Sequence, residues 1–391
     1  MPKLNAEACN AKGFAMAATV DAPTQAAAPK PHERAYRIAT TVLLTLIAIL
    51  AAVVVTAHIV TRVLFAPFYA DATEAFPLPG LDSGFVPQDL AMVQVDAPSA
   101  TTADANAAAG PTDSATGEAP LWLFGGYQAD GGASPVWVRT PDGKTGKLQL
   151  QDERGNPYDG HGSGISSNGA WSFVTCEGGY LVYKTADLAE AAQGAVSGAN
   201  ASVKAAAKVD LDFTPAFLNV DDGTLYVGEF FRDGNFATDQ SHHLMTPDGG
   251  TNHALMYAYD QGDGPYGFNV QANRVYSIPE QVQGCAVTDG GDIVLSTSYG
   301  FAPSYLQVFD HARVIQDGTF VADGREVPLY CLDSRNLKGS LAVPPMSEGI
   351  VAVDGTIYVS EESASSKYLF GRFYGAGSVY TLPESTLESL G

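Results

Sequence analysis

Three of the seven histidines in this 391-residue sequence stand close together and offer imidazole groups for a metal. They are His242, His243 and His253, in the segment HHLMTPDGGTNH. Two histidines on one face of a helix bind zinc when their spacing is His-x3-His, and this segment lacks that spacing. It is instead rich in Pro, Asp and Gly, which form turns. We therefore predict that these histidines lie in an exposed loop and that they form no metal centre.

Pairs of acidic residues could supply oxygen ligands or general acids. None of the pairs fits the Asp-x-Asp-x-Asp-Gly pattern of a calcium-binding loop, and they stand near glycines, so we predict that they form turns. They are Asp221-Asp222, Asp260/Asp263 and Asp289/Asp292. The sequence also contains no Gly-x-Ser-x-Gly motif, no phosphate-binding loop and no Cys-x-x-Cys pair. No catalytic motif therefore identifies an activity.

The four cysteines offer thiol chemistry or disulfides. Cys9 falls in the N-terminal segment, which leaves an odd number in the rest of the chain: Cys176, Cys285 and Cys331. Cys285 is expected on an inner strand and Cys331 on an outer strand, too far apart for a disulfide. We predict buried, unpaired thiols that behave as small apolar side chains.

The elements that must position these residues are short strands joined by glycine turns. Four segments share an apolar strand, a turn of the Asn-Gly or Asp-Gly type and a second alternating strand, a strong hairpin signal. They read GISSNGAWSFVTC, FLNVDDGTLYVGEFF, CAVTDGGDIVLST and IVAVDGTIYVSEE. Repeated meanders of this kind are typical of a β-propeller. We predict an all-β domain of five or six blades, with a β-sandwich as the alternative, and expect segment 120–127 to close the ring.

The repeated phrase at the start of each inner strand resembles that of the NHL, gluconolactonase and strictosidine-synthase-like propellers. Three phrases match it, and Thr214-Pro215-Ala216 departs from it. The matching phrases are Ser163-Gly164-Ile165, Gln283-Gly284-Cys285 and Glu348-Gly349-Ile350. The resemblance covers about residues 160–383 and implies the fold rather than an activity.

In such propellers the residue before the glycine faces the mouth of the central channel. The resemblance therefore implies that five residues surround one opening: His161, Ser163, Thr214, Gln283 and Glu348. Similar lactone hydrolases hold Ca²⁺ there through Glu, Asn and Asp oxygens, and the cation polarises the substrate carbonyl. Glu348 is the candidate catalytic carboxylate here, but Asn168 and Asn219 lie past the phrase, so Ca²⁺ is an option rather than an expectation.

Composition agrees with a turn-rich β protein. The chain is 46% hydrophobic, contains 41 Gly and 23 Pro, and carries a formal charge of −22. An acidic chain of this kind does not present the Lys and Arg that phosphate backbones require, so we predict that it does not bind nucleic acid.

One apolar segment, Ile38 to Val60, contains no Asp, Glu, Lys or Arg. As a helix it would extend roughly 34 Å, enough to cross a hydrocarbon core of about 30 Å. We predict a transmembrane helix over 38–62 that serves as a signal-anchor. A cleaved signal peptide, cut near Tyr69-Ala70-Asp71, is the alternative.

Charges flanking the span predict its orientation. Lys and Arg precede it, whereas no Lys or Arg occurs between Arg62 and Arg139. Positive residues stay in the cytoplasm, so the N-terminus is predicted inside and the C-terminal domain outside the cell. Composition then divides the chain into a disordered cytoplasmic tail, the transmembrane helix, an acidic Ala/Pro/Thr-rich linker and the propeller. The predicted segments are 1–37, 38–62, 63–118 and 119–391.

Two hypotheses about function follow. The first is a membrane-anchored, extracytoplasmic propeller that binds a protein, peptide or glycan and has no cofactor. The second is a Ca²⁺-dependent lactonase or esterase with its site at the channel mouth. The missing Asn and Asp ligands favour the first, and the sequence leaves open whether the protein is an enzyme.

Overall fold

The computed structural model describes residues 31–96, 118–368, 371–374 and 376–391. The predicted tail up to residue 30 and linker residues 97–117 lie outside the described residues. The chain divides into a unit that ends at Ala52 and a second unit from Val53 to Gly391.

A single long helix dominates the start of the described chain. This helix, α1, covers Pro31–Leu64 and exceeds the predicted span of 38–62 at both ends. Its segment Arg34–Leu64 contains an 18-residue stretch with a mean hydropathy of 2.8 and is long and apolar enough to cross a membrane. Leu, Ile and Val side chains along it are exposed rather than packed against protein.

The rest of the chain forms a five-bladed β-propeller. The innermost strands of the five sheets, β2, β6, β11, β17 and β23, contact one another in that order, and β23 contacts β2, so the ring is closed. Five clusters of buried apolar side chains lie between the blades, one at each boundary between neighbours. Because each blade buries both faces against its neighbours, the hydrophobic core is the set of these interfaces. The prediction of an all-β propeller is confirmed, with five blades.

The first two blades carry additions at their outer edges. The first contains β2 (Phe85–Asp96), β3 (Glu118–Gln128), β4 (Pro135–Arg139), β5 (Thr145–Gln151) and the parallel edge strand β9 (Ala201–Lys204). The second contains β6 (Ile165–Ser167), β7 (Trp171–Cys176), β8 (Gly179–Lys184) and β10 (Ala207–Asp210). Helix α3 (Thr185–Val196) follows β8 and packs against the first blade.

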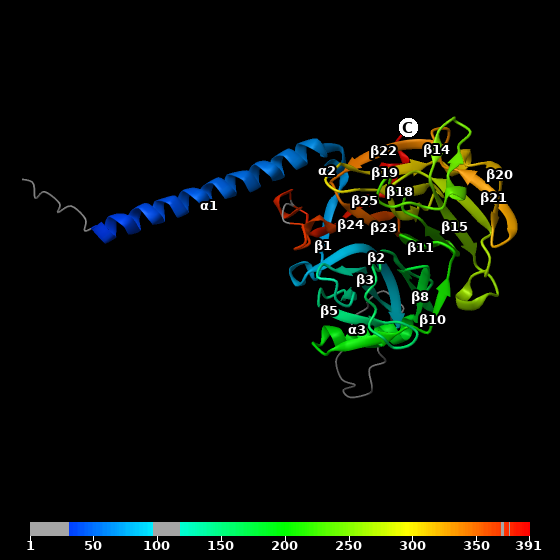
Figure 1. Cartoon of the computed structure of the whole chain (residues 1–391), viewed down its shortest axis with the longest axis horizontal. Helices are drawn as coiled ribbons and strands as arrows, with labels where there is room; N and C mark the ends of the chain where they lie inside the picture. Colours follow the sequence, from blue (N-terminus) through cyan, green and yellow to red (C-terminus); the bar gives the residue numbers. More distant parts are fainter. Residues whose placement is uncertain (1–30, 97–117, 369–370, 375) are drawn as a thin grey trace, which may run out of the picture. The chain divides into compact units, whose positions relative to one another are not determined.

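The third blade has six strands because it receives a hairpin from the fourth. Its strands are β11 (Phe217–Asp221), β12 (Thr224–Gly228), β15 (Ala254–Asp260), β16 (Arg274–Ile278), β21 (Arg325–Cys331) and β20 (Gln316–Ala322). The β20–β21 hairpin lies at the periphery in Figure 1, whereas β2, β11 and β23 lie toward the middle of the domain. A small hairpin, β13 (Leu244–Met245) with β14 (Thr251–Asn252), belongs to the insertion that follows β12.

The last two blades complete the ring. The fourth contains β17 (Val282–Val287), β18 (Ile293–Thr297), β19 (Ser304–Phe309) and β22 (Leu337–Val343). The fifth contains β23 (Ser347–Val353), β24 (Thr356–Glu361), β25 (Ser378–Pro383) and, at its edge, β1 (Thr73–Pro77). The short helix α4 (Glu384–Glu388) ends the chain beside this blade.

The predicted Asp-Gly turns join the two innermost strands of two blades. In the third blade, Asp222 and Gly223 have φ of 37° and 70°, and Asp354 and Gly355 have φ of 48° and 71° in the fifth. Two consecutive residues with positive φ are typical of the type I′ turn, whose twist suits a tight hairpin.

The predicted linker 63–118 was wrong where the structure describes it. After α1, helix α2 (Ala66–Asp71) places Phe68, which is fully buried, against Tyr380 with ring centroids 5.7 Å apart. Strand β1 then pairs with β25, and β2 forms the inner strand of the first blade. The propeller therefore begins about fifty residues before the predicted boundary at 119. Segment 120–127 does not close the ring, because it lies in β3, and β1 closes it instead.

Candidate functional site

A cavity of about 770 Å³ opens at the beginning of the inner strands. All five residues that the sequence placed around one opening line it: His161, Ser163, Thr214, Gln283 and Glu348. Gln88 on the inner strand β2 also lines it. Other lining residues come from loops and second strands, among them Tyr127, Phe230, Phe236, Tyr299, Phe301, Glu362, Lys367 and Tyr368. A cavity of this size matches those that hold small organic ligands.

Strand register shows which lining residues are equivalent between blades. Each inner strand has one residue that pairs with the equivalent residue of the second strand in its own blade. These inner-strand residues are Leu90, Ile165, Leu218, Cys285 and Ile350. Two residues earlier stand Gln88, Ser163, Ala216, Gln283 and Glu348. Ala216, rather than Thr214, therefore occupies the equivalent position in the third blade. Thr214 still reaches the cavity, where its hydroxyl accepts the Gly178 N–H at 3.1 Å.

The glycine of the repeated phrase is required because the inner strands approach closely at the axis. A Cβ on Gly164 would lie 2.6 Å from the Leu218 nitrogen, and one on Gly284 would lie 3.0 Å from the Glu348 carbonyl oxygen. A Cβ on Gly349 would lie 2.0 Å from Oδ1 of Asp89. The glycines thus narrow the channel and leave the preceding residues at its mouth.

Glu348 lines the cavity but is buried there, with 2% of its surface exposed. Ser298 donates to its Oε1 at 3.2 Å. Burial raises the pKa of Glu348 well above its usual range, and the nearby Glu362 and Asp89 carboxylates raise it further. The surroundings of this carboxyl group therefore disfavour its ionisation.

Glu362 is the acidic partner that the sequence did not identify. It stands just after β24, in the short 3-10 turn Glu362–Ala364, and is 7% exposed. Gln88 donates to its Oε2 at 2.6 Å. Burial raises the pKa of Glu362 to about 7, and hydrogen bonds from Tyr368 and Gln88 and the Lys367 charge oppose this rise. Two acids that resist ionisation thus share one cavity.

Aromatic side chains form the walls. Phe230, Phe236 and Tyr299 lie within 5.3 to 6.4 Å of one another, measured between ring centroids. Phe236 is 52% exposed, and Phe301, which also lines the cavity, is 61% exposed. Across the cavity, Tyr127 stacks on His161 with centroids 4.0 Å apart, and the Lys367 ammonium donates to the Tyr127 hydroxyl. One wall is therefore apolar and the other polar.

Asp89 lies near these acids, but both of its carboxylate oxygens accept hydrogen bonds from the backbone. Its Oδ1 accepts the Leu90 N–H at 2.9 Å, and its Oδ2 accepts the Ile165 N–H at 2.8 Å. Burial raises the pKa of Asp89, while these two hydrogen bonds oppose the rise. The side chain therefore ties the first blade to the second.

The residues at the cavity do not match the Ca²⁺ site of the lactone hydrolases. Glu348 and Glu362 supply carboxylates, but both Asp89 oxygens accept backbone N–H groups. Asn219 lies further along β11, where its Oδ1 accepts from the Ser166 hydroxyl at 3.4 Å. Asn168 donates to the Tyr266 carbonyl at 2.8 Å and accepts the Trp171 N–H. A Ca²⁺ ion takes six to eight oxygens, so these residues do not fit the ion.

The prediction that an exposed loop holds the three histidines was wrong for His242, which is 6% exposed. Its Nδ1 lies 2.9 Å from Oε2 of Glu229, and Nδ1 of His253 lies 2.7 Å from Oε1 of Glu280. The carboxylate of Glu229 also accepts the Leu255 N–H at 3.0 Å. These pairs fasten the insertion after β12, which carries Phe236, to the third and fourth blades.

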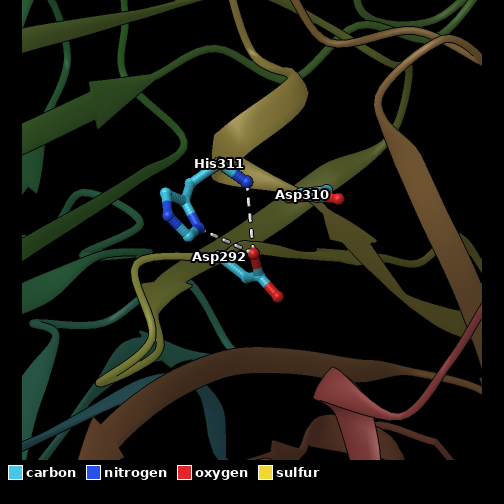
Figure 2. A group of neighbouring side chains, drawn as sticks. All are labelled: Asp292, Asp310 and His311. Carbon is cyan, nitrogen blue, oxygen red and sulfur yellow. Dashed lines mark hydrogen bonds and ion pairs between the residues drawn. The ribbon is translucent and has the colours of Figure 1, made fainter.

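A second acidic group lies on the fourth blade, away from the cavity lining. Figure 2 shows Asp292, Asp310 and His311, whose ligand atoms lie within 4.8 Å of one another. Lys338 pairs with Oδ2 of Asp292 at 2.7 Å, and Arg313 pairs with Asp310 at 2.7 Å. Burial would raise the pKa of Asp292, but hydrogen bonds from Lys338 and His311 hold it below its usual value. Side-chain cations thus already neutralise these carboxylates.

The acidic pairs lie only partly in turns. Asp222 stands in the β11–β12 turn, whereas Asp221 and Asp260 are the last residues of β11 and β15, and Asp260 pairs with Arg274 at 2.6 Å. Cys176, Cys285 and Cys331 are buried and free, which confirms the prediction of unpaired thiols, whereas Cys9 lies outside the described residues. Burial raises the pKa of each of these three thiols, so they are poor nucleophiles.

Comparisons with known proteins assign no activity to this chain. No family model matches the sequence, and no curated protein matches it significantly. An oxidoreductase (glucose dehydrogenase) of Thermus thermophilus is 11% identical, with a TM-score of 0.36, over 80% of this chain and 99% of that one. The PQQ-bound aldose sugar dehydrogenase of Streptomyces coelicolor is 10% identical, with a TM-score of 0.36, over 80% and 97%.

Hydrazine synthase of Kuenenia stuttgartiensis is 11% identical, with a TM-score of 0.31, over 70% of this chain and 56% of that one. Likenesses this distant carry no argument about chemistry. The classification rests on the closed ring of five sheets: the chain is a β-propeller, and its resemblance to the propeller superfamily holds at the level of the fold.

Proposed function

We propose that this chain is a membrane-anchored, extracytoplasmic propeller that binds a ligand in its central cavity. The observation that carries the proposal is the convergence of equivalent residues from five blades on one cavity with buried acids and exposed aromatic rings. Exposed aromatic surface beside a few convergent polar groups is typical of ligand sites. The mixture suits a small ligand, or the end of a peptide or glycan.

Two observations support a retained anchor. Phe65 and Phe68, directly after α1, are buried in the core between the fourth and fifth blades. The Arg62 guanidinium lies 4.1 Å from the centre of the Tyr69 ring. Cleavage near Tyr69-Ala70-Asp71 would remove Phe68 from this core, so a cleaved signal peptide fits poorly. The basic flank before the span supports an outside location of the propeller.

Protease added to intact cells is expected to remove the propeller and to leave a small stub in the membrane fraction. The physical reason is the positive flank, which holds the N-terminus in the cytoplasm. Immunoblots against N-terminal and C-terminal tags measure the outcome, with permeabilised cells as the control. A protected C-terminus would contradict the orientation, and a C-terminal fragment recovered in the medium without protease would indicate cleavage.

Filling the cavity is expected to abolish ligand binding without unfolding the protein. Ala216→Trp places an indole at the cavity position that the other blades fill with Gln88, Ser163, Gln283 and Glu348. A library of small molecules and short peptides is screened by thermal shift on the detergent-solubilised chain. Hits that stabilise the wild type should lose their effect in Ala216→Trp and keep it in Ala199→Trp, an exposed control. If the hits stabilise both variants equally, the cavity is not the site.

A further inference from the structure

Glu348 leaves one carboxylate oxygen free at the cavity. Among the described residues only Ser298 donates to this side chain, and it reaches Oε1 alone. The side chain is 2% exposed, so water compensates little for the missing donors. A buried carboxylate needs a cation or several hydrogen bonds to ionise. The cavity thus contains a group that a positively charged ligand would satisfy.

A second acid at the cavity, Glu362, also favours a positively charged ligand. Glu362 faces the same cavity, and its charge and that of Glu348 disfavour each other. Lys367, the cation beside Glu362, is exposed at the rim, where its ammonium lies 4.6 Å from the centre of the Tyr127 ring and donates to the Tyr127 hydroxyl. Lys367 therefore compensates only part of the negative potential of Glu348 and Glu362. The chain's charge of −22 also attracts cations from solution.

The aromatic wall of the cavity favours a ligand that has an apolar body. Phe236 and Phe301 expose large ring surfaces at the cavity, and Phe230 lies edge-on to Phe236 at 5.3 Å between centroids. Ring faces attract ammonium groups and bury apolar surface at once. They cannot ligate a metal, which takes oxygen from several sides.

We infer that the cavity takes a ligand with an ammonium group on an apolar body, with the ammonium against Glu348 and Glu362 and the body against Phe236 and Phe301. This inference rests on the proposed binding function. Two sources share this chemistry: a small aromatic amine, and the free N-terminus of a peptide whose first side chain is apolar. Either ligand would stabilise the ionised forms of Glu348 and Glu362 by forming ion pairs with them.

The probes are matched pairs that differ in charge. Phenethylamine is compared with 2-phenylethanol, and the peptide Phe-Gly-Gly amide with its N-acetylated form, each by calorimetric titration of the full chain in detergent micelles. We expect the charged member of at least one pair to bind at least tenfold more tightly than the neutral member. Binding of the amine alone assigns a small-molecule source, and tighter binding of the peptide assigns an N-terminus.

Three variants test the residues. Glu348→Gln, and the double variant with Glu362→Gln, should weaken the charged probe at least tenfold, whereas the exposed control Glu190→Gln on α3 should leave it unchanged. Phe236→Ala should weaken charged and neutral probes alike, because it removes apolar contact. Each variant is checked by its melting curve, so a loss of binding is separated from a loss of folding.

The pH dependence provides an independent readout. Ionised carboxylates bind the ammonium, so affinity should fall as pH drops below the Glu362 pKa of about 7. Between pH 8 and pH 6 this predicts a loss of about tenfold for a single ionisation. In the double glutamine variant the affinity should no longer change over this range.

Two results would overturn the inference. One is equal binding of charged and neutral probes, and the other is an affinity that the double variant and Glu190→Gln leave equally unchanged. If neutral ligands bind and Ala216→Trp blocks them, the proposed binding function stands while the inference fails. If Ala216→Trp leaves every ligand's binding unchanged, the proposed function itself fails.

Discussion

A fragment that begins at residue 119 is expected to aggregate or to remain unfolded. It lacks β2, whose long pairing with β3 supplies the inner strand of the first blade. It also lacks β1, so the edge of β25 is left unpaired and the ring is open. Loss of an inner strand exposes the apolar interfaces of the first blade with both neighbours, and unpaired edges promote aggregation.

The matched fragment is 65–391, which keeps Phe65, Phe68 and both strands but omits the apolar helix. It should elute as a monomer, give a β-type circular dichroism spectrum and melt cooperatively. The fragment 119–391, expressed and purified in the same way, should do none of these. A monomeric, cooperatively melting 119–391 would contradict the assignment of β1 and β2 to the ring.

Replacing Glu362 by Gln is expected to stabilise the protein at alkaline pH. The folded carboxyl has a pKa of about 7, raised from 4.5 in the unfolded chain mainly by burial. A raised acid pKa means that the folded state binds the proton more tightly, so the contribution of Glu362 to stability is greatest below pH 4.5 and is lost as pH rises through 7. The difference corresponds to about 3 kcal/mol. Glutamine avoids this loss and can still accept from Gln88.

Denaturant unfolding of the wild type and Glu362→Gln at pH 4 and pH 8 measures this effect. The free energies of unfolding should agree at pH 4 and should differ by about 3 kcal/mol in favour of the variant at pH 8. Glu190→Gln, on the exposed face of α3, is the control and should change neither value. A variant that is less stable than the wild type at pH 8 but not at pH 4 would contradict this prediction, because it would mean that the ionised carboxylate of Glu362 stabilises the fold.

The sequence predicted the parts of the fold that depend on local chemistry. Asp-Gly turns require positive φ, which few other residues adopt, so the hairpins at Gly223 and Gly355 were visible in the sequence. The glycine phrase was visible for a related reason, since Gly164, Gly284 and Gly349 stand where a Cβ would clash. These positions also led to three of the five mouth residues, Ser163, Gln283 and Glu348, because the residue before each glycine faces the channel.

The parts of the fold and the site that the sequence did not predict depend on contacts between segments far apart in the chain. Strand β1 is mostly exposed and lacks an alternating apolar pattern, so only its pairing with the end of the chain defines it. In the third blade Phe217 stands where the other blades have glycine or Asp89, which shifted the predicted phrase by two residues. Glu362 follows a second strand rather than preceding an inner one. Its partner Gln88 lies 274 residues away, in a segment predicted to be linker.

Ring closure by β1 also has a mechanical consequence. This strand lies in the chain between the apolar helix and β2, and it holds the fifth blade through its hydrogen bonds to β25. If the apolar helix is anchored in a membrane, as proposed, a pull along the polypeptide reaches the buried side chains of Phe65 and Phe68 first and this short strand next. We therefore expect β1 to bear this load and the fifth blade to open before the other four.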